Sequence, residues 1–512
     1  MSVTYSTDGI TATFTGGSGD TLSGATADLS GATVAIIVGY SSIGNDAFRT
    51  ASGLTSITIP ASVTSIGTYA FYQASSLTTV TFKTDSSLNS IGSSAFRETS
   101  ALTSITIPAS VTSIGDDAFI DTSDLTTVTF EADSSLNSIG TWAFYKSGLT
   151  SITIPASVES IGDNAFRSAS ALTTVTFEAD SSLTSIGNNA FRGSALTSIT
   201  IPASVTSIGA SAFLYTSALT SITVTQPNTD YKDNDGVLFN KDGTTLIQYP
   251  IGNTRTTYAI PEGVIIIGQI SFLNASALTS VTIPASVTTV VDGDTFQGCF
   301  KLQSITVDQN NANYSSSLDG VLFNKSQTVL VSFPGGKTGS YIIPDSVNSF
   351  FDWAFAEVIL SSVTIPEGVT SISPYMFYKT TNLTTVTFEA GSSLISIGSN
   401  AFHSSGVTTV IASQPLITTM EWSTTDPNTI SGKSGITVST PPPPTPICFP
   451  AGTPVTTDQG LVAIEKLNTD KHTIRGKEII AITQSRPLQK HIVCFEKDSL
   501  SKNVPSQQTL CS

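Results

Sequence analysis

Short runs in which apolar and polar residues alternate recur along most of the chain. One of them, at residues 56–59, reads Ser-Ile-Thr-Ile and is followed by Pro60. Alternation with a period of two is typical of a β-strand that buries one face. Proline ends such a strand because its backbone nitrogen has no hydrogen to donate to a neighbour. Each run therefore predicts one short strand.

The residues between these strands are also patterned. After Pro60 the apolar residues Val63, Ile66 and Phe71 are separated by polar ones, and Gly67 supplies a turn. We expect this stretch to lead the chain back over the core to the next strand. A unit of this size cannot bury its own apolar side, so consecutive units are expected to stack and bury it between them.

The unit returns with small changes along the chain, and two types of unit alternate. One type reads Ile-Thr-Ile-Pro in its strand, and the other reads Thr-Val-Thr-Phe followed by an acidic turn. The phenylalanine near the end of each unit recurs at steps of 22 to 25 residues in the first half of the array. These residues are Phe48, Phe71, Phe96, Phe119, Phe144, Phe166, Phe191, Phe213, Phe272, Phe296, Phe355, Phe377 and Phe402. A period in the twenties indicates a solenoid, here of about thirteen coils.

The unit consensus is L-x-x-I-x-I-P-x-x-V-x-x-I-G-x-x-A-F, and it resembles the BspA-like leucine-rich repeats of bacterial and protist surface proteins. The resemblance covers roughly residues 40 to 412. It implies a leucine-rich-repeat solenoid with one short parallel β-strand in each coil of 22 to 25 residues. It also implies a non-enzymatic protein at the cell surface or outside the cell, which binds a protein or glycan ligand through its solenoid.

Two interruptions and two changes of composition divide the chain. Residues 235–241 and 319–325 are near-copies (Asp-Gly-Val-Leu-Phe-Asn-Lys), and we interpret the segments near 226–260 and 308–343 as hairpin insertions. Residues 1–40 are expected to form an N-terminal cap on a solenoid of residues 41–412. A Ser/Thr/Pro-rich linker at 413–446 precedes a separate small domain at 447–512.

Composition narrows the classes of function. Of the 512 residues, 22 are basic and 38 acidic, which gives a net charge of −16 and argues against nucleic acid as a partner. Four cysteines are too few for a disulfide framework. No apolar run approaches the roughly 20 residues of a membrane span, and no signal peptide or anchor is visible.

The array offers little chemistry of its own. Residues 1–447 contain one histidine, His403, and one cysteine, Cys299, so no catalytic triad, metal site or cofactor site is predicted there. We expect Cys299 to pack as a small hydrophobic residue and His403 to lie in a solvated turn. Asp116 and Asp117 invite a calcium interpretation, but equivalent positions of other units hold serine, asparagine, threonine or tyrosine, so no ligand set recurs and a solvated turn is favoured.

A threonine occupies the same strand position in eight consecutive units. These residues are Thr58, Thr81, Thr106, Thr129, Thr153, Thr176, Thr200 and Thr223. Stacked coils would place them about 4.8 Å apart. Strand propensity with hydrogen bonding between neighbouring hydroxyls explains such a ladder. The alternatives are a contact face for a glycan or protein, or a surface that orders water as ice does, although the curvature of such arrays disfavours ice.

The C-terminal domain begins with a second motif. Residues 448–467 contain, in order, Cys448, a Gly-Thr turn with Thr453, a valine-containing strand, a hairpin glycine and Ile-Glu-Lys-Leu. This block resembles the opening of Hint domains, the fold that inteins share with Hedgehog autoprocessing domains. The resemblance implies an all-β domain in which the Cys448 thiol attacks the carbonyl carbon of Ile447, an N–S acyl shift that leads to self-cleavage.

The same domain departs from the family pattern. The Thr-x-x-His block and the terminal His-Asn of the family are not found before Ser512, and His472 and His491 are interpreted as surface residues. We therefore expect a truncated Hint domain with impaired cleavage, because an isolated cysteine thiol is mostly protonated at neutral pH. The alternative function is an autoprocessing protein for which the array is only cargo.

Overall fold

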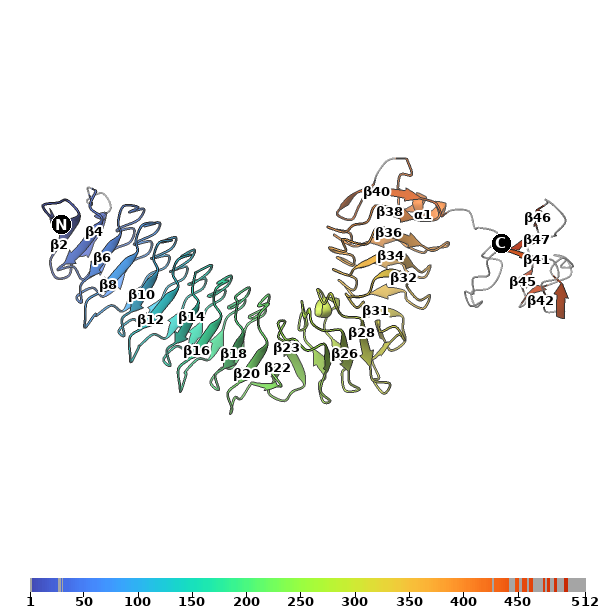
Figure 1. Ribbon diagram of the computed structural model, residues 1–512, viewed down its shortest axis with the longest axis horizontal. Helices are drawn as coiled ribbons and strands as arrows, with labels where there is room; N and C mark the ends of the chain where they lie inside the picture. The colour runs from blue at the N-terminus through green and yellow to red at the C-terminus, as the bar shows by residue number, and fades with distance from the viewer. Residues whose placement is uncertain are drawn as a thin grey trace.

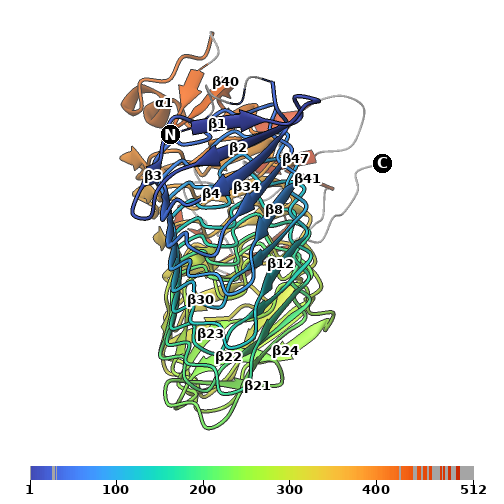
Figure 2. The ribbon, with the colours of Figure 1, turned by 90° about the vertical axis from the view of Figure 1, so that its left-hand side faces the viewer.

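The computed structural model describes residues 2–25, 29, 31–425 and 428–441, together with the backbone of short strands between 447 and 495. The described array is a long curved solenoid in which each coil lies against the next (Figure 1). Figure 2, seen from the N-terminal side, shows the long strands of successive coils one behind another on one flank. The predicted β-solenoid of parallel strands is therefore confirmed.

Most coils contain two strands rather than the single strand predicted. In one coil β10 (Ser104–Ile107) pairs in parallel with β12 (Thr127–Phe130) of the next coil. The same coil then forms β11 (Ser113–Ile114), which lies between β9 (Ser90–Ile91) and β13 (Ser138–Ile139). The second strand has only two residues, so it is too short to show an alternating pattern in the sequence.

The long strands form one row along the solenoid. Besides β10 and β12 they are β2 (Thr11–Thr15), β4 (Val34–Val38), β6 (Ser56–Ile59), β8 (Thr79–Phe82), β14 (Ser151–Ile154), β16 (Thr174–Phe177), β18 (Ser198–Ile201), β20 (Ser221–Val224), β24 (Thr257–Ala259), β26 (Ser280–Ile283), β28 (Ser304–Val307), β32 (Gly339–Ile342), β34 (Leu360–Ile365), β36 (Thr385–Phe388) and β38 (Thr409–Ile411).

The short strands form a second row. Besides β9, β11 and β13 they are β3 (Thr21–Leu22), β5 (Ser42–Ile43), β7 (Ser65–Ile66), β15 (Ser160–Ile161), β17 (Ser185–Ile186), β19 (Ser207–Ile208), β25 (Ile266–Ile267), β27 (Thr289–Val290), β33 (Ser349–Phe350), β35 (Ser371–Ile372) and β37 (Ser396–Ile397). From β3 to β19 this row is one continuous sheet of nine strands.

The described array has about seventeen coils, so the predicted thirteen is too low. Two of the missed coils carry the insertions, and their core aromatic residues are Tyr249 and Phe333 in place of the unit phenylalanine. The Tyr249 backbone N–H donates to the Ser271 carbonyl at 2.8 Å, as a unit phenylalanine does to the next coil. The other two are the first coil, with β2, and the last, with β38. The first and last coils have no unit phenylalanine, and in the other two an insertion lengthens the step from the preceding phenylalanine.

A stack of phenylalanine rings fills the core beside the turn that follows each short strand. From Phe48 to Phe213 the ring centroids are 4.9 to 5.9 Å apart, with ring planes within 6° of parallel. The backbone supports the stack, because the Phe96 N–H donates to the Ala118 carbonyl of the next coil at 2.8 Å. Burial of each such side chain contributes about 1.5–3 kcal/mol.

A glycine follows most of the short strands and lets neighbouring coils approach closely. A Cβ atom on Gly115 would lie 2.7 Å from the backbone nitrogen of Ser93 in the preceding coil. No side chain fits at that distance, so the Ile-Gly of the repeat is a requirement of coil spacing.

Each insertion lies within a coil, after its long strand, and begins as an antiparallel meander. The first consists of β21 (Tyr231–Asn234), β22 (Val237–Asn240) and β23 (Thr245–Gln248), and the second of β29 (Tyr314–Ser316), β30 (Leu322–Asn324) and β31 (Val329–Ser332). β23 then pairs in parallel with the short strand β25, and β31 with β33. The last strand of each meander thus takes the place of a short strand.

The middle strand of each meander is buried on both faces. Leu238 packs into the core of the preceding coils, whereas Val237 and Phe239 pack into the core of the following ones. In the second meander Leu322 and Phe323 are divided in the same way. The insertions are therefore wedges that separate the core into three parts, and the solenoid changes direction near β22 and again near β31 (Figure 1).

A buried asparagine anchors each wedge. The Asn311 side chain donates to the carbonyl oxygens of Pro284 and Val287 at 2.8 and 2.9 Å, and its Oδ1 accepts from the N–H groups of Asn313 and Tyr314. Asn228 makes the corresponding bonds in the first wedge. The asparagine satisfies backbone groups that the interrupted ladder leaves unpaired.

The chain after β38 ends the solenoid with α1 (Gln414–Thr419) and a hairpin of β39 (Asn428–Ile430) and β40 (Lys433–Ser439), of which β40 runs parallel to β38. Further on, the backbone forms β41 (Ile447–Pro450), β42 (Pro454–Thr457), β43 (Gly460–Ala463), β44 (Thr473–Ile474), β45 (Lys477–Glu478), β46 (Thr483–Ser485) and β47 (Ile492–Phe495).

Replacing the buried anchor of the second wedge tests its role. Asn311→Ala leaves the Val287 carbonyl oxygen and two N–H groups without partners, since the Pro284 carbonyl still accepts from the Val287 N–H, and we expect a loss of about 2–4 kcal/mol in the free energy of unfolding. Urea unfolding followed by circular dichroism measures the loss. The matched control is Asn313→Ala, since the Asn313 side chain is exposed two residues away. Equal stability of the two variants would contradict the anchor role.

Candidate binding surfaces

The predicted threonine ladder forms on the flank that carries the long strands. Its residues face each other in pairs across neighbouring strands: Thr58 with Thr81, Thr106 with Thr129, Thr153 with Thr176, and Thr200 with Thr223. Thr58 and Thr223 are partly buried and the other six are exposed. The hydroxyls of Thr200 and Thr223 are 2.9 Å apart, so at that step the ladder has the hydrogen bond that the prediction invoked.

The ladder is interrupted at every second step. β12 and β14 are not paired as a sheet, and one backbone bond of 3.3 Å, from the Thr150 N–H to the Thr126 carbonyl, connects the coils there. The same break occurs between β16 and β18. The threonines therefore form successive pairs rather than one evenly spaced plane.

The residues of the predicted cleavage site are described only in part. The Ile447 and Cys448 backbones lie in β41, which pairs antiparallel with β47 so that Cys448 is opposite Cys494. Thr453, His472 and His491 lie outside the described residues. The geometry of the proposed cleavage chemistry therefore stays a prediction.

The remaining polar candidates have structural environments. Cys299 is buried, its Sγ lies 3.1 Å from the Phe272 carbonyl oxygen, and burial raises the pKa of its thiol to about 12. His403 is exposed, and its ring stacks on Tyr378. Asp116 accepts a hydrogen bond of 2.7 Å from the Thr141 N–H of the next coil. Within the described ranges no three His, Cys, Asp or Glu residues are grouped as a metal site would need.

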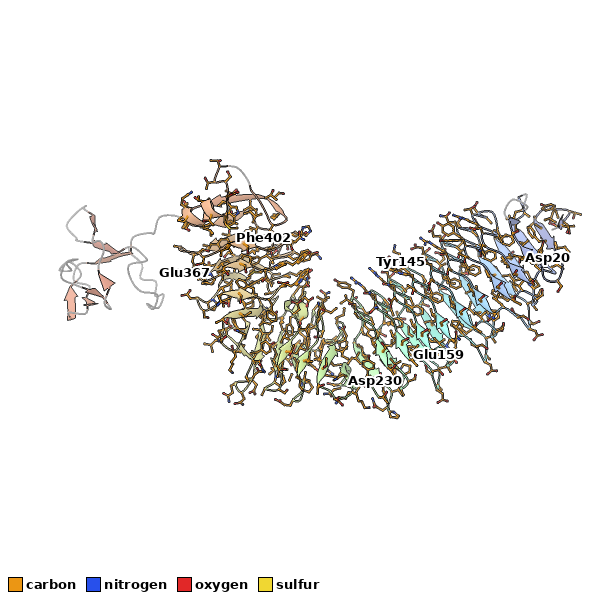
Figure 3. All side chains as sticks on the ribbon, turned by 180° about the vertical axis from the view of Figure 1, so that it is seen from behind. Asp20, Tyr145, Glu159, Asp230, Glu367 and Phe402 are labelled. Carbon is orange, nitrogen blue, oxygen red and sulfur yellow. The ribbon has the colours of Figure 1, made fainter. Side chains whose placement is uncertain are left out.

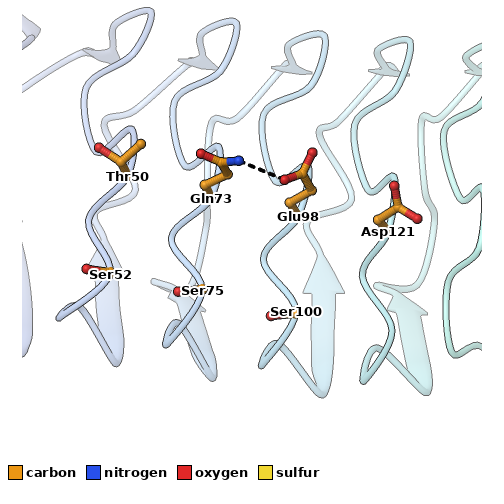
Figure 4. Close-up of a pocket in the computed structure, with 7 residues that line it drawn as sticks. All are labelled: Thr50, Ser52, Gln73, Ser75, Glu98, Ser100 and Asp121. Carbon is orange, nitrogen blue, oxygen red and sulfur yellow. Dashed lines mark hydrogen bonds between the residues drawn. The ribbon is translucent and has the colours of Figure 1, made fainter.

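A surface that the sequence did not reveal lies along the turns that follow the short strands and contain the unit phenylalanines. The residue two positions after each phenylalanine has a left-handed backbone and points outward, as Thr50, Gln73, Glu98 and Asp121 do (Figure 4). With the serines two residues further on, they line an open groove of about 520 Å³. The Gln73 side chain donates to Glu98 Oε2 at 2.8 Å within it. The groove is polar, with carboxylate, amide and hydroxyl groups.

These turns lie on the inner edge of the curved solenoid, and the turns after the long strands lie on its outer edge. Tyr145 is on the inner edge, whereas Glu159, Asp230 and Glu367 are on the outer one (Figure 3). Sequence comparison of the coils could have located the inner edge only through the positions two residues before and two residues after each phenylalanine. The residue type there changes from coil to coil, so no motif marks it.

Positive charge on the inner edge is mostly paired. Arg49 forms an ion pair with Asp46, Arg97 with Glu98, and Lys146 with Asp121, at 3.0, 3.3 and 3.9 Å respectively. The six side chains are 32% to 54% exposed, and solvent screens the attraction between their charges. Each pair therefore contributes less than about 1 kcal/mol to stability. These three cations therefore add no unpaired positive charge to the edge, and residues 1–447, with 14 basic and 32 acidic residues, have a net charge of −18.

Comparison with known families identifies the array. The description "BspA type Leucine rich repeat region (6 copies)" matches residues 30–147, 137–235, 252–338 and 331–423. The chain belongs to this leucine-rich-repeat family. No curated protein matches it, and no described helix has the length and apolar character that a bilayer crossing needs.

Several solved structures are similar to the chain. A leucine-rich cell surface protein of Faecalibacterium prausnitzii is 30% identical, over 76% of this chain and 93% of that one, with a TM-score of 0.50. The pneumococcal vaccine antigen PcpA is 24% identical over 70% and 85%, with a TM-score of 0.48. A leucine-rich repeat protein of Bacteroides ovatus is 22% identical over 79% and 88%, with a TM-score of 0.41.

One buried carboxyl group makes stability depend on pH. Asp294, in the 3-10 helix η2 (Gly293–Phe296), has a buried Oδ1 with no hydrogen-bond partner. Burial, and secondly the nearby Asp292, raise the pKa of Asp294. A raised pKa in the folded state means that this group favours folding at low pH and opposes it once the pH rises through that pKa.

We therefore expect Asp294→Asn to raise the free energy of unfolding at pH 7 by about 1–2 kcal/mol. The gain should shrink below about pH 4, where the wild-type carboxyl group is also neutral. Urea unfolding at both pH values measures the difference, with exposed Asp133→Asn as the control. A gain that is the same at both pH values would count against this account.

Proposed function

We propose that the solenoid is a binding module that holds a protein or glycan partner on its exposed surface. The observation that carries this proposal is membership of the BspA-type family over most of the array. The similar Faecalibacterium structure, described as a cell surface protein, supports display outside the cell. A stacked array also suits the role, because its coils present the same backbone positions repeatedly along one extended face.

The proposal predicts that the full chain binds at least one extracellular protein or glycan. Immobilised full-length protein is exposed to an array of glycans and to a panel of purified extracellular matrix proteins, and hits are measured by surface plasmon resonance. We expect at least one saturable interaction that is tighter than about 1 mM. The matched negative control is the same protein unfolded in urea. Absence of saturable binding across both panels would contradict the proposal.

We also propose, on the resemblance of residues 448–467 to the Hint opening block, that the complete protein cleaves itself before Cys448. The Cys448 thiol attacks the Ile447 carbonyl carbon, the peptide C–N bond breaks, and the freed nitrogen takes the proton. Water then hydrolyses the thioester, which releases residues 1–447 with a carboxylate and restores the thiol. The proline-rich linker before the block would separate the two parts.

Mass spectrometry of the protein expressed from its whole reading frame tests this second proposal. We expect a fragment that ends at Ile447 and accumulates faster when hydroxylamine is added, because hydroxylamine attacks thioesters. Cys448→Ala should abolish the fragment, and Cys494→Ala, a change at the residue opposite in the sheet, serves as the control. A wild-type protein that stays intact, or equal cleavage in the Cys448 variant, would refute it.

A further inference from the structure

The residue two positions before each phenylalanine has a left-handed backbone in most coils. Twelve such residues have φ between 51° and 63°. They are Asp46, Tyr69, Ser94, Asp117, Trp142, Asn164, Asn189, Ser211, Ile270, Trp353, Tyr375 and Asn400. Asparagine and aspartate tolerate this conformation, because their short polar side chains bond locally.

Large side chains do not suit this position. A left-handed backbone costs a residue other than glycine about 1–3 kcal/mol, and for a bulky residue it is a true outlier. Tyr69, Trp142, Trp353 and Tyr375 nevertheless occupy it. Asn164 and Asn189 show that the array can place a tolerated residue there, so coil formation does not require the aromatic side chains.

The outlying aromatic residues gather with others into three platforms on the inner edge. The first platform is Tyr69 and Tyr72, whose ring centroids are 5.5 Å apart, and the second is Trp142 and Tyr145, at 4.7 Å. The third consists of Trp353, Tyr375 and Tyr378, in which the Trp353 and Tyr375 rings are parallel at 4.3 Å. All of these rings are at least partly exposed to solvent.

A cation lies over each platform. The Arg49 guanidinium carbon is 5.3 Å from the Tyr72 ring centroid, and that of Arg167 is 5.3 Å from Trp142. Lys379 Nζ is 5.1 Å from the Tyr378 centroid. These side chains add hydrogen-bond donors beside apolar ring faces. The polar groove of Figure 4 runs beside the first platform, since its Gln73 directly follows Tyr72.

We infer that the inner edge binds a neutral linear polysaccharide, an inference that rests on the proposed binding function and assigns its site. A sugar ring has an apolar C–H face and a rim of hydroxyl groups. The aromatic platforms match the face, and the carboxylate, amide and hydroxyl groups of the groove match the rim. A polymer of repeated sugar rings also matches platforms that recur along the axis of the solenoid.

Charge and shape favour this ligand over the alternatives. The net charge of −18 on residues 1–447 repels a polyanion, and Arg49, Arg97 and Lys146 on the edge already have acidic partners. A stable protein interface buries about 800 Å² on each partner around an apolar centre. Here polar residues such as Ser94 and Asp117 separate the first two platforms.

The test replaces two tryptophans with asparagine, the residue that other coils carry at the same position, as at Asn164 and Asn189. Full-length wild type and the double variant Trp142→Asn/Trp353→Asn are run in native gels that contain barley β-glucan, xylan or dextran, with polygalacturonate as an acidic probe. We expect a neutral polysaccharide to retard the wild type, and the double variant to bind it at least about tenfold more weakly. The melting temperature should stay the same or rise, because asparagine tolerates the left-handed backbone.

The controls separate the site from the general function. Thr106→Val/Thr153→Val on the strand flank should bind as the wild type does. Retardation that is unchanged in the tryptophan variant, or retardation by polygalacturonate alone, would overturn the inference. A melting temperature that falls together with binding would make the tryptophans structural and overturn it as well. Failure of all neutral probes, while a matrix protein still binds, would refute this site and leave the proposed binding function intact.

Discussion

The structure depends on one constraint: a single coil cannot bury its own apolar side. Each coil has room for only one layer of Leu, Ile, Val and Phe, so the partner for that layer must be the next coil. The parallel stack from Phe48 to Phe213 shows the result, because each ring between the two ends has a stacked ring on either side and all of them are buried. The same constraint demands glycine at positions such as Gly115, where the backbones come closest. Fold stability is therefore spread along the array, and the outward residues are left free to vary.

The wedges show how such an array can bend without exposing its core. Inserting β22 or β30 breaks the row of long strands, and it would leave backbone groups unpaired at the break. Asn228 and Asn311 satisfy those groups, while apolar residues on both faces of each inserted strand continue the core. The resulting curve gives the solenoid an inner edge, on which polar and aromatic side chains from different coils face the same space (Figure 3).

The fold could be predicted from the sequence because the same pattern of apolar residues, glycine and phenylalanine recurs in most coils. The short strands were missed, since a pair such as Ser113–Ile114 is too brief to show a period. Tyr249 and Phe333 were missed as core aromatics, because an insertion separates each of them from the preceding unit phenylalanine and breaks the regular spacing. The threonines face each other in pairs by register, but the evenly spaced ladder that we predicted is interrupted at every second step, and their ligand role stays a prediction. The aromatic platforms were not found at all, because the residue type two positions before the phenylalanine varies between coils and only the structure shows that Trp142 has a left-handed backbone there.

The central claim is that stacking fixes the coils while the inner edge carries the binding function. The most direct test is a crystal structure of the full chain with an oligosaccharide of the neutral polysaccharide that it binds. We expect a sugar ring against Trp142 or Trp353, with its hydroxyl groups directed to the polar side chains of the same edge. A sugar bound on the threonine-bearing flank, or on the outer turns near Glu159, would contradict it.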